Sequence, residues 1–198
     1  MFLATDELRK ILDNNDMMIL KNNIRGASID LRINHIAYTR IDENPLILAE
    51  GCDDPEELLK GRTKEIDLAK GFLLKPGDYL YGKTFEKIKV PDSMCGLIMP
   101  RSTFARIGLI LPISQFANPG YEGNLPLIIH NASRVEVEIP PYYRVAQIMF
   151  ADLRGNAVPY GSQKDAKYQH EASGANASLN DEELNNAIRF LKEEDVRG

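Results

Sequence analysis

The sequence has no excess of positive charge. Its 198 residues include 24 Lys and Arg against 29 Asp and Glu, which gives a net charge of −5 at pH 7. Proteins that bind nucleic acid through its phosphates typically present a clustered basic surface. The charge balance therefore argues against a nucleic-acid partner, and any phosphate that the protein binds is expected to be held locally.

Long apolar runs are also missing. No stretch approaches the roughly 20 apolar residues of a membrane-spanning helix. The N-terminus, MFLATDELRK, turns polar and acidic within a few residues, unlike the apolar core of a secretory signal. We therefore expect a cytoplasmic protein without a membrane partner.

Cysteine and histidine are scarce. Cys52 and Cys95 could pair, but two cysteines in a chain of this kind are more often reduced packing residues. His35, His130 and His170 are scattered without the spacing of metal ligands. The sequence therefore predicts no metal site built from protein side chains.

The composition is that of a globular protein, with 43% hydrophobic and 27% charged residues, and the length suits one domain. Residues 5–14 place Leu8, Ile11 and Leu12 on one helical face behind a Thr5 cap. Residues 53–61 and about 180–195 also carry helix signals, with Asn180 beginning the latter.

Between the helices the pattern is that of short strands separated by turns rich in proline and glycine. The predicted strands lie within residues 28–33, 72–84, 86–91, 95–100, 125–131, 134–140 and 143–153. Helices do not alternate with strands in the central hundred residues. The pattern therefore favours an all-β sandwich or barrel over a parallel α/β sheet.

The stretch PRSTFARIGLIL is the most informative for chemistry. If its centre is a helical turn, the backbone N–H groups at its start, the hydroxyls and the guanidinium groups form a cradle for an anion. The candidate residues are Arg101, Ser102, Thr103 and Arg106. A surface turn with solvated arginines is an equally good interpretation of the composition alone.

Five motifs in order resemble those of the dCTP deaminase and dUTPase superfamily. They are GASIDLRIN, PRSTFARIGL, NPGYEGNLPLIIHN, RVAQIMF and PYGSQKDAKYQHEASGANAS, which together cover roughly residues 24 to 178. DAKY and the N-terminal helix favour the dCTP deaminase branch. The resemblance implies a distorted jelly-roll or β-barrel subunit of a homotrimer. It also implies nucleotide sites at subunit interfaces and Mg²⁺ carried by the triphosphate.

The resemblance also assigns residues to the nucleotide. Ser102 and Arg106 would lie at the triphosphate and the catalytic water, and Asp30 would support the phosphate side. Gln147 would help to hold the nucleotide, although a turn or rim hydrogen bond for Asp30 and a buried structural amide for Gln147 are alternatives. The C-terminal arm, residues 166–178, would fold over the nucleotide.

The remaining binding residues divide between the arm and the third motif. Tyr160 and Lys167 suit triphosphate oxygens. Tyr121 would stack near the deoxyribose, with ordinary packing as its alternative. Asn118, Gly120 and the following strand would form the pocket that reads the base, because a hairpin can offer backbone N–H and C=O groups to a pyrimidine edge.

The chain departs from the family where the chemistry takes place. Asn118 stands where the enzymes that cleave the triphosphate have an acid, and Ile128 stands where the deaminases have a glutamate. Neither side chain can accept a proton from water. Glu122, beside the third motif, is expected to point away from the face of Tyr121, and Glu136 and Glu138 have the pattern of a solvent-facing strand edge. Glu171 lies near the position of an expected phosphate-binding glutamine.

Three hypotheses follow. The protein deaminates dCTP to dUTP, or it hydrolyses dUTP to dUMP and pyrophosphate, or it binds the nucleotide as a scaffold or sensor without turnover. In each case we expect a nucleotide-binding domain over residues 1–178, followed by a helical extension over residues 179–198.

Overall fold

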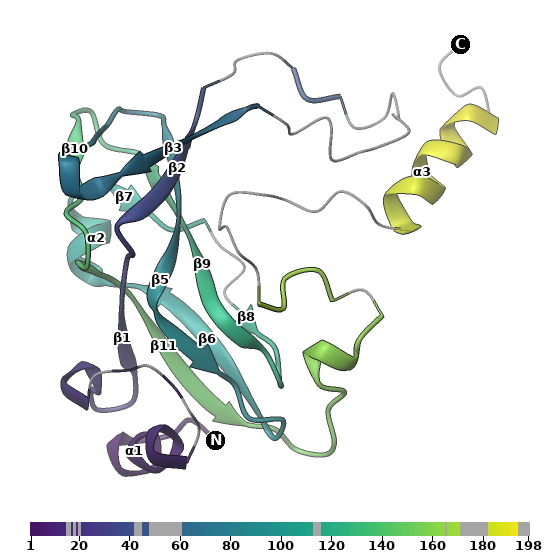
Figure 1. The fold of residues 1–198 in the computed structure, drawn as a ribbon. Coiled ribbons are helices and arrows are strands. Elements are labelled where there is room, and N and C mark those ends of the chain that lie inside the picture. The colour runs from purple at the N-terminus through teal and green to yellow at the C-terminus, as the bar shows by residue number, and fades with distance from the viewer. Residues whose placement is uncertain are drawn as a thin grey trace.

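A computed structural model describes residues 1–14, 17, 19, 21–41, 45–47, 61–112, 116–164, 166–170 and 182–193. Most regular structure in these ranges is strand (Figure 1). The helix predicted over residues 53–60, together with Cys52 and the part of the arm beyond His170, lies outside the described residues.

Two open sheets form the body of the molecule. The larger sheet contains, in spatial order, β3 (Thr63–Asp67), β2 (Ile36–Arg40), β5 (Tyr79–Lys89), β9 (Glu122–Asn131) and β7 (Leu109–Ile110). The second sheet contains β1 (Ile29–Arg32), β11 (Arg144–Asp152), β6 (Met94–Pro100) and β8 (Phe116–Ala117). A separate two-stranded ribbon pairs β10 (Val137–Glu138) with β4 (Leu73–Leu74).

Alternation of side chains along the strands builds the core. In β9, Leu125, Leu127 and Ile129 are buried, whereas the residues between them are half-buried. The inner residues of β11, Ile148 and Phe150, are fully buried. The predicted all-β jelly-roll is therefore confirmed, and its described strands form open sheets rather than a closed barrel.

The longest strand corrects the sequence prediction. Residues 72–84 and 86–91 suggested separate strands, yet residues 79–89 form the single strand β5. Between the paired residues Lys83–Pro126 and Lys87–Asn124, three residues of β5 oppose one residue of β9. A β-bulge thus joins the two predicted halves. The charged strand β3, with the sequence TKEID, and strand β2 were not predicted.

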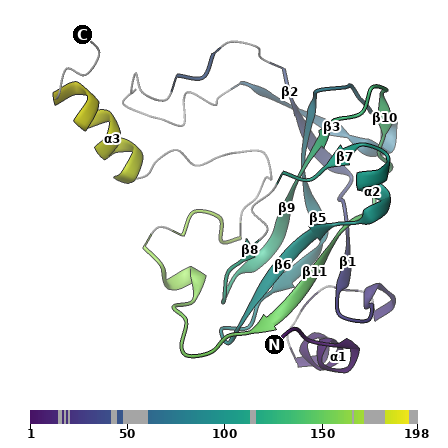
Figure 2. The same cartoon turned by 180° about the vertical axis from the view of Figure 1, so that it is seen from behind.

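Helices lie at the margins of the sheets. In α1 (Thr5–Asn14) the predicted apolar face is confirmed, because Leu8 and Ile11 are buried. Thr5 is the first helical residue rather than a cap, and its hydroxyl donates to the carbonyl of Arg25 at 3.0 Å. The C-terminal α3 (Glu182–Glu193) stands to one side of the sheets in both views (Figures 1 and 2). No helix in the described ranges has the length and apolar character to cross a membrane.

Candidate functional site

The predicted anion cradle is a helical turn, as the resemblance implies. Helix α2 (Ser102–Arg106) follows β6 directly, and the Arg101 N–H donates to the carbonyl of Val145 at 3.0 Å. Phe104 is buried and anchors the turn. Ser102, Thr103 and Arg106 remain exposed, so their hydroxyl and guanidinium groups face solvent.

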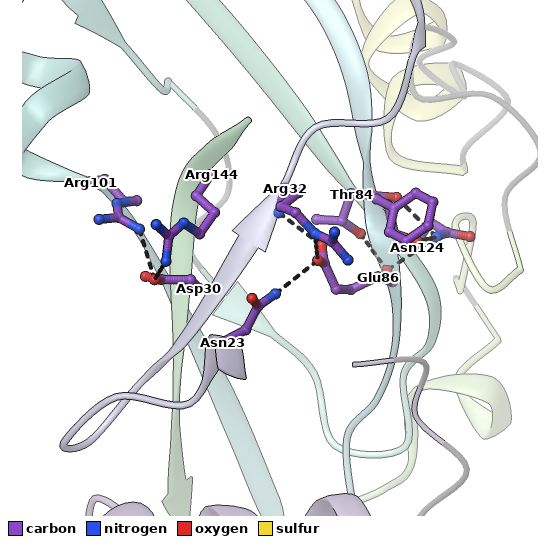
Figure 3. A network of polar contacts seen from close by, with 9 residues as sticks. Asn23, Asp30, Arg32, Thr84, Glu86, Arg101, Asn124 and Arg144 are labelled. Carbon is purple, nitrogen blue, oxygen red and sulfur yellow. Dashed lines mark hydrogen bonds and ion pairs between the residues drawn. The ribbon is translucent and has the colours of Figure 1, made fainter. Parts of the chain in front are cut away.

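Asp30 organises the arginines at the base of this turn. Its Oδ2 accepts hydrogen bonds from Arg101 at 2.7 Å, from Arg25 at 2.8 Å and from Arg144 at 3.3 Å. The Asp30 side chain is 3% exposed, whereas the three arginine side chains are 29 to 44% exposed. Figure 3 shows Arg101 and Arg144 converging on this carboxylate. One buried negative charge thus holds three positive charges at the surface.

Gln147 lies beside this cluster. It pairs in register with Asp30 across β1 and β11, and with Met99 of β6 on its other side. Its side-chain oxygen accepts a hydrogen bond from the Ser28 hydroxyl at 3.2 Å. The structure therefore brings together Asp30, Arg101 and Gln147, three of the residues that the resemblance assigns to the nucleotide. Sequence analysis missed Arg25 and Arg144, although Arg144 opens the fourth motif.

Asn118, Gly120 and Tyr121 form a turn. The Tyr121 N–H donates to the Asn118 carbonyl at 3.1 Å, and the Gly120 N–H donates to Val90 at 3.0 Å. Gly120 has φ +73°, and a Cβ atom there would lie 2.7 Å from Cβ of Pro159. Only glycine fits this turn without moving the chain that leads into the arm.

Tyr121 and the arm are close together. The Tyr121 ring lies 5.9 Å from the Tyr160 ring, and its hydroxyl donates to the Asn124 carbonyl at 3.0 Å. The Tyr160 hydroxyl accepts the Tyr168 N–H at 3.0 Å and still has its own proton to donate. Lys167 precedes Tyr168. The structure thus groups Tyr121 and Tyr160, two of the predicted binding residues, and the third, Lys167, adjoins the docked Tyr168 in the chain.

Ile128 lies on the outer face of the larger sheet. It is half-buried and pairs with Tyr81 of β5. Two residues further along β9, the His130 ring stacks on Tyr79 with the centroids 4.4 Å apart. The position of the expected carboxylate therefore presents an alkyl group beside aromatic rings.

The two groups of predicted residues lie at opposite ends of β6. Ala117, next to Asn118, pairs with Gly96 near the start of the strand, whereas Ser102 follows its end. Six residues of extended chain span roughly 20 Å. Helix α2 and β8 are accordingly well apart in both views (Figures 1 and 2). Ser102 and Asn118 of the same chain do not meet.

Glu122 is held by lysines. Its carboxylate lies 2.6 Å from Lys87 Nζ and 3.8 Å from Lys89 Nζ. The hydrogen bond from Lys87 lowers the pKa of Glu122, and the charges of Lys87, Lys89 and His170 act in the same direction. A carboxylate stabilised in its ionised form is a weaker base. The geometry therefore offers Glu122 no role as a substitute for the missing acids.

A metal ion held by the protein needs His, Cys, Asp or Glu side chains close together. Within the described ranges no three His, Cys, Asp or Glu residues gather to hold one. The Asp30 oxygen that faces the cluster already accepts three guanidinium hydrogen bonds. The free, buried Cys95 is a packing residue, as expected.

Comparison with known proteins shows which family this chain resembles. A family model described as dCTP deaminase-like matches residues 2–153. The chain is 31% identical to a dCTP deaminase, dUMP-forming, of Dictyoglomus thermophilum over 203 residues, covering 98% of this chain and 100% of that protein. It is 29% identical to a dCTP deaminase of Actinobacillus pleuropneumoniae, with 92% and 100% covered.

A solved structure has the same fold. The 2′-deoxycytidine 5′-triphosphate deaminase from Agrobacterium tumefaciens superposes with a TM-score of 0.60 at 21% sequence identity. The superposition covers 75% of this chain and 48% of that longer chain. At this identity the likeness is one of architecture.

Proposed function

Because the chain belongs to the dCTP deaminase-like family, we propose that it binds a pyrimidine deoxynucleoside triphosphate with Mg²⁺ at sites shared between the subunits of a homotrimer. The observation that carries the proposal is the arrangement of Arg101, Arg25 and Arg144 around the buried Asp30. Three guanidinium groups held at the surface by one carboxylate leave a net positive charge beside α2. A triphosphate supplies the complementary charge.

The phosphate half of the site consists of α2 and the residues beside it. Ser102 and Thr103 offer hydroxyl donors, and Arg106 offers an exposed guanidinium group. Arginine suits phosphate because its planar group donates two parallel hydrogen bonds. Mg²⁺ bound to phosphate oxygens would neutralise part of the triphosphate charge.

The nucleoside half consists of the turn at Asn118–Tyr121 and the start of the arm. The Tyr121 ring suits contact with the deoxyribose, and the turn suits contact with the base. Lys167 and the Tyr160 hydroxyl bring two further donors toward the phosphates. Since this half lies far from α2 in one chain, two subunits are needed to complete one site.

The chemistry of the family requires proton transfer at this site. Deamination of dCTP adds water to the base and releases ammonia, giving dUTP. The name of the Dictyoglomus relative also includes dUMP as its product. In this chain the two positions that would carry the acids are Asn118 and Ile128. We therefore propose that the protein binds the nucleotide and turns it over weakly or not at all by either reaction.

Three measurements on the wild-type protein distinguish the hypotheses. Ammonia release from dCTP reports deamination, and pyrophosphate release from dUTP reports diphosphatase activity. Calorimetric titration with dCTP, dUTP and Mg²⁺ reports binding. At a cytoplasmic pH we expect the protein to bind the nucleotide and to release little ammonia or pyrophosphate. Rapid release of ammonia or pyrophosphate would show that another residue supplies the base, and absence of binding would contradict the proposal.

A further inference from the structure

One side chain of the arm, Gln169, bridges the two sides of Tyr121 and fastens the arm to the Asn118–Tyr121 turn. Gln169 Nε2 donates to the Gly120 carbonyl at 3.1 Å, and Gln169 Oε1 accepts the Glu122 N–H at 3.2 Å. The two backbone groups flank Tyr121 on either side. The carboxamide thus uses both its donor and its acceptor on this turn.

Backbone contacts extend this attachment. The His170 N–H donates to the Glu122 carbonyl at 3.2 Å, and the Tyr168 N–H donates to the Tyr160 hydroxyl at 3.0 Å. A Cβ atom at Gly161 would lie 3.5 Å from Gln169 Nε2, so the amide also packs against this backbone. Three consecutive arm residues are therefore docked on their own subunit.

We propose that Gln169 is a positioning residue of the nucleotide site. It fixes the arm, and with it Lys167, at one distance from Tyr121, so that the phosphate donors of the arm are placed before the nucleotide arrives. The inference rests on the proposed binding of a triphosphate. Its physical basis is preorganisation. When the binding conformation of the protein is already populated, little binding free energy is lost to ordering the arm.

The chemistry of the side chain suits this task. A neutral amide satisfies a carbonyl and an N–H at once, and it adds no charge near a triphosphate. The Glu122 carboxylate is directed to Lys87 at 2.6 Å, so the Glu122 backbone remains available to the arm. Removing the amide removes both of these hydrogen bonds, whereas the backbone hydrogen bond from His170 to Glu122 remains.

The test uses Gln169→Met, which keeps the length of the side chain and removes both hydrogen bonds. Gln163→Met is the matched control, because Gln163 also donates one hydrogen bond, to the Val158 carbonyl at 3.0 Å, upstream of the docked residues. Affinities for dCTP and dUTP are compared with those for dCMP and dUMP, all with Mg²⁺. Trypsin cleavage after Lys167 is followed by mass spectrometry without nucleotide.

For Gln169→Met we expect triphosphate affinity to fall roughly tenfold and monophosphate affinity to change less than about twofold, because two hydrogen bonds to the arm are lost. Cleavage after Lys167 should accelerate by a similar factor. Gln163→Met should leave the triphosphate affinity, the monophosphate affinity and the cleavage rate unchanged. An equal loss for tri- and monophosphates, or unchanged cleavage, would overturn the positioning role. Failure of the wild type to bind any of the four nucleotides would instead overturn the proposed function.

Discussion

Arg106 is the exposed cation of α2, and its role can be tested without disturbing the core. We expect Arg106→Ala to weaken binding of the triphosphate by about 1.5 to 3 kcal/mol, or roughly 10- to 150-fold, because one charge-assisted contact is lost. Isothermal titration with dCTP and dUTP measures the change. Arg9→Ala, which removes an exposed arginine paired with Asp6 on α1, is the control. Unchanged affinity for every deoxynucleoside triphosphate would show that α2 is no anion site.

By the motif resemblance, Asn118 and Ile128 stand where the family chemistry needs a carboxylate. General-base catalysis contributes about 10²- to 10⁴-fold to a rate, so restoring one acid should produce a measurable gain. We expect Asn118→Asp to raise pyrophosphate release from dUTP and Ile128→Glu to favour ammonia release from dCTP. The second change also places a carboxylate beside Tyr81, which costs stability. Fast turnover by the wild type, unaffected by Asn118→Asp, would show that the third motif is aligned incorrectly.

Glu122 makes the free energy of unfolding depend on pH, and the sign of this dependence follows from its ion pair with Lys87. The Lys87 hydrogen bond lowers the pKa of Glu122 in the folded state. The pair therefore stabilises the fold above the ordinary glutamate pKa, and this contribution disappears as the pH falls through the lowered value. We expect Lys87→Met to reduce the free energy of unfolding at pH 7 and to have little effect at the acid end. A constant difference between the two proteins from pH 7 to pH 3 would contradict this.

Among the elements, β5 depends on the side chains that satisfy its bulge. Glu86 is fully buried, and its carboxylate accepts from Arg32 Nε at 2.7 Å, from Arg32 N at 2.8 Å and from Asn23 Nδ2 at 3.2 Å (Figure 3). The Asn124 amide donates to the Thr84 and Glu86 carbonyls at 3.0 and 3.1 Å. These contacts satisfy groups that the interrupted ladder leaves unpaired.

We expect Glu86→Ala to destabilise the protein by about 3 to 5 kcal/mol, because it leaves a largely buried Arg32 and an amide without their acceptor. Denaturant unfolding measures the loss. Glu65→Ala is the control, since Glu65 makes one exposed hydrogen bond with Tyr38 on the adjacent strand. A loss as small as that of the control would mean that the bulge relaxes without Glu86.

The sequence predicted the helices and strands that follow from one physical rule, and it missed those for which several rules compete. Short runs of β-branched and aromatic residues between proline and glycine turns located β1, β6, β9 and β11, and the 3.6-residue period located α1. Strand β3 was missed because TKEID holds three charged residues and only its pairing with β2 makes it a strand. The bulge was missed because Thr84 and Glu86 look like a polar break, although both are buried.

The candidate site likewise contains residues that the sequence indicates and residues that only the fold reveals. Motif resemblance made Ser102, Arg106, Asp30 and Tyr121 candidates, since each falls inside a recognisable run. It could not locate Gln169, because a glutamine in a polar segment has no pattern that indicates a bridge to Gly120 and Glu122. Arg25 was also out of reach, since its contact with Asp30 depends on the path of the loop before β1.

At the scale of the whole molecule, the outer face of the second sheet is suited to contact with another copy. Met149 of β11, Leu97 of β6 and Phe116 of β8 lie in one row across adjacent strands. Met99 is 37% exposed and Phe116 is 45% exposed. If another copy packs on this apolar row, the subunit contact lies beside Asp30 and Arg101 and hence beside the proposed phosphate site.

We expect the protein to be a trimer in solution, because one chain holds Ser102 and Asn118 at opposite ends of β6 and a nucleotide of ordinary size cannot reach both. Light scattering at micromolar concentration should give three times the subunit mass. Leu97→Glu places a charge in the middle of the apolar row and should shift the mass toward the monomer and weaken dCTP binding together. Val135→Glu, at an apolar position that is 63% exposed, is the control and should leave the trimer intact. A wild-type monomer would contradict the shared site, and a Leu97→Glu trimer with normal affinity would move the subunit contact to another face.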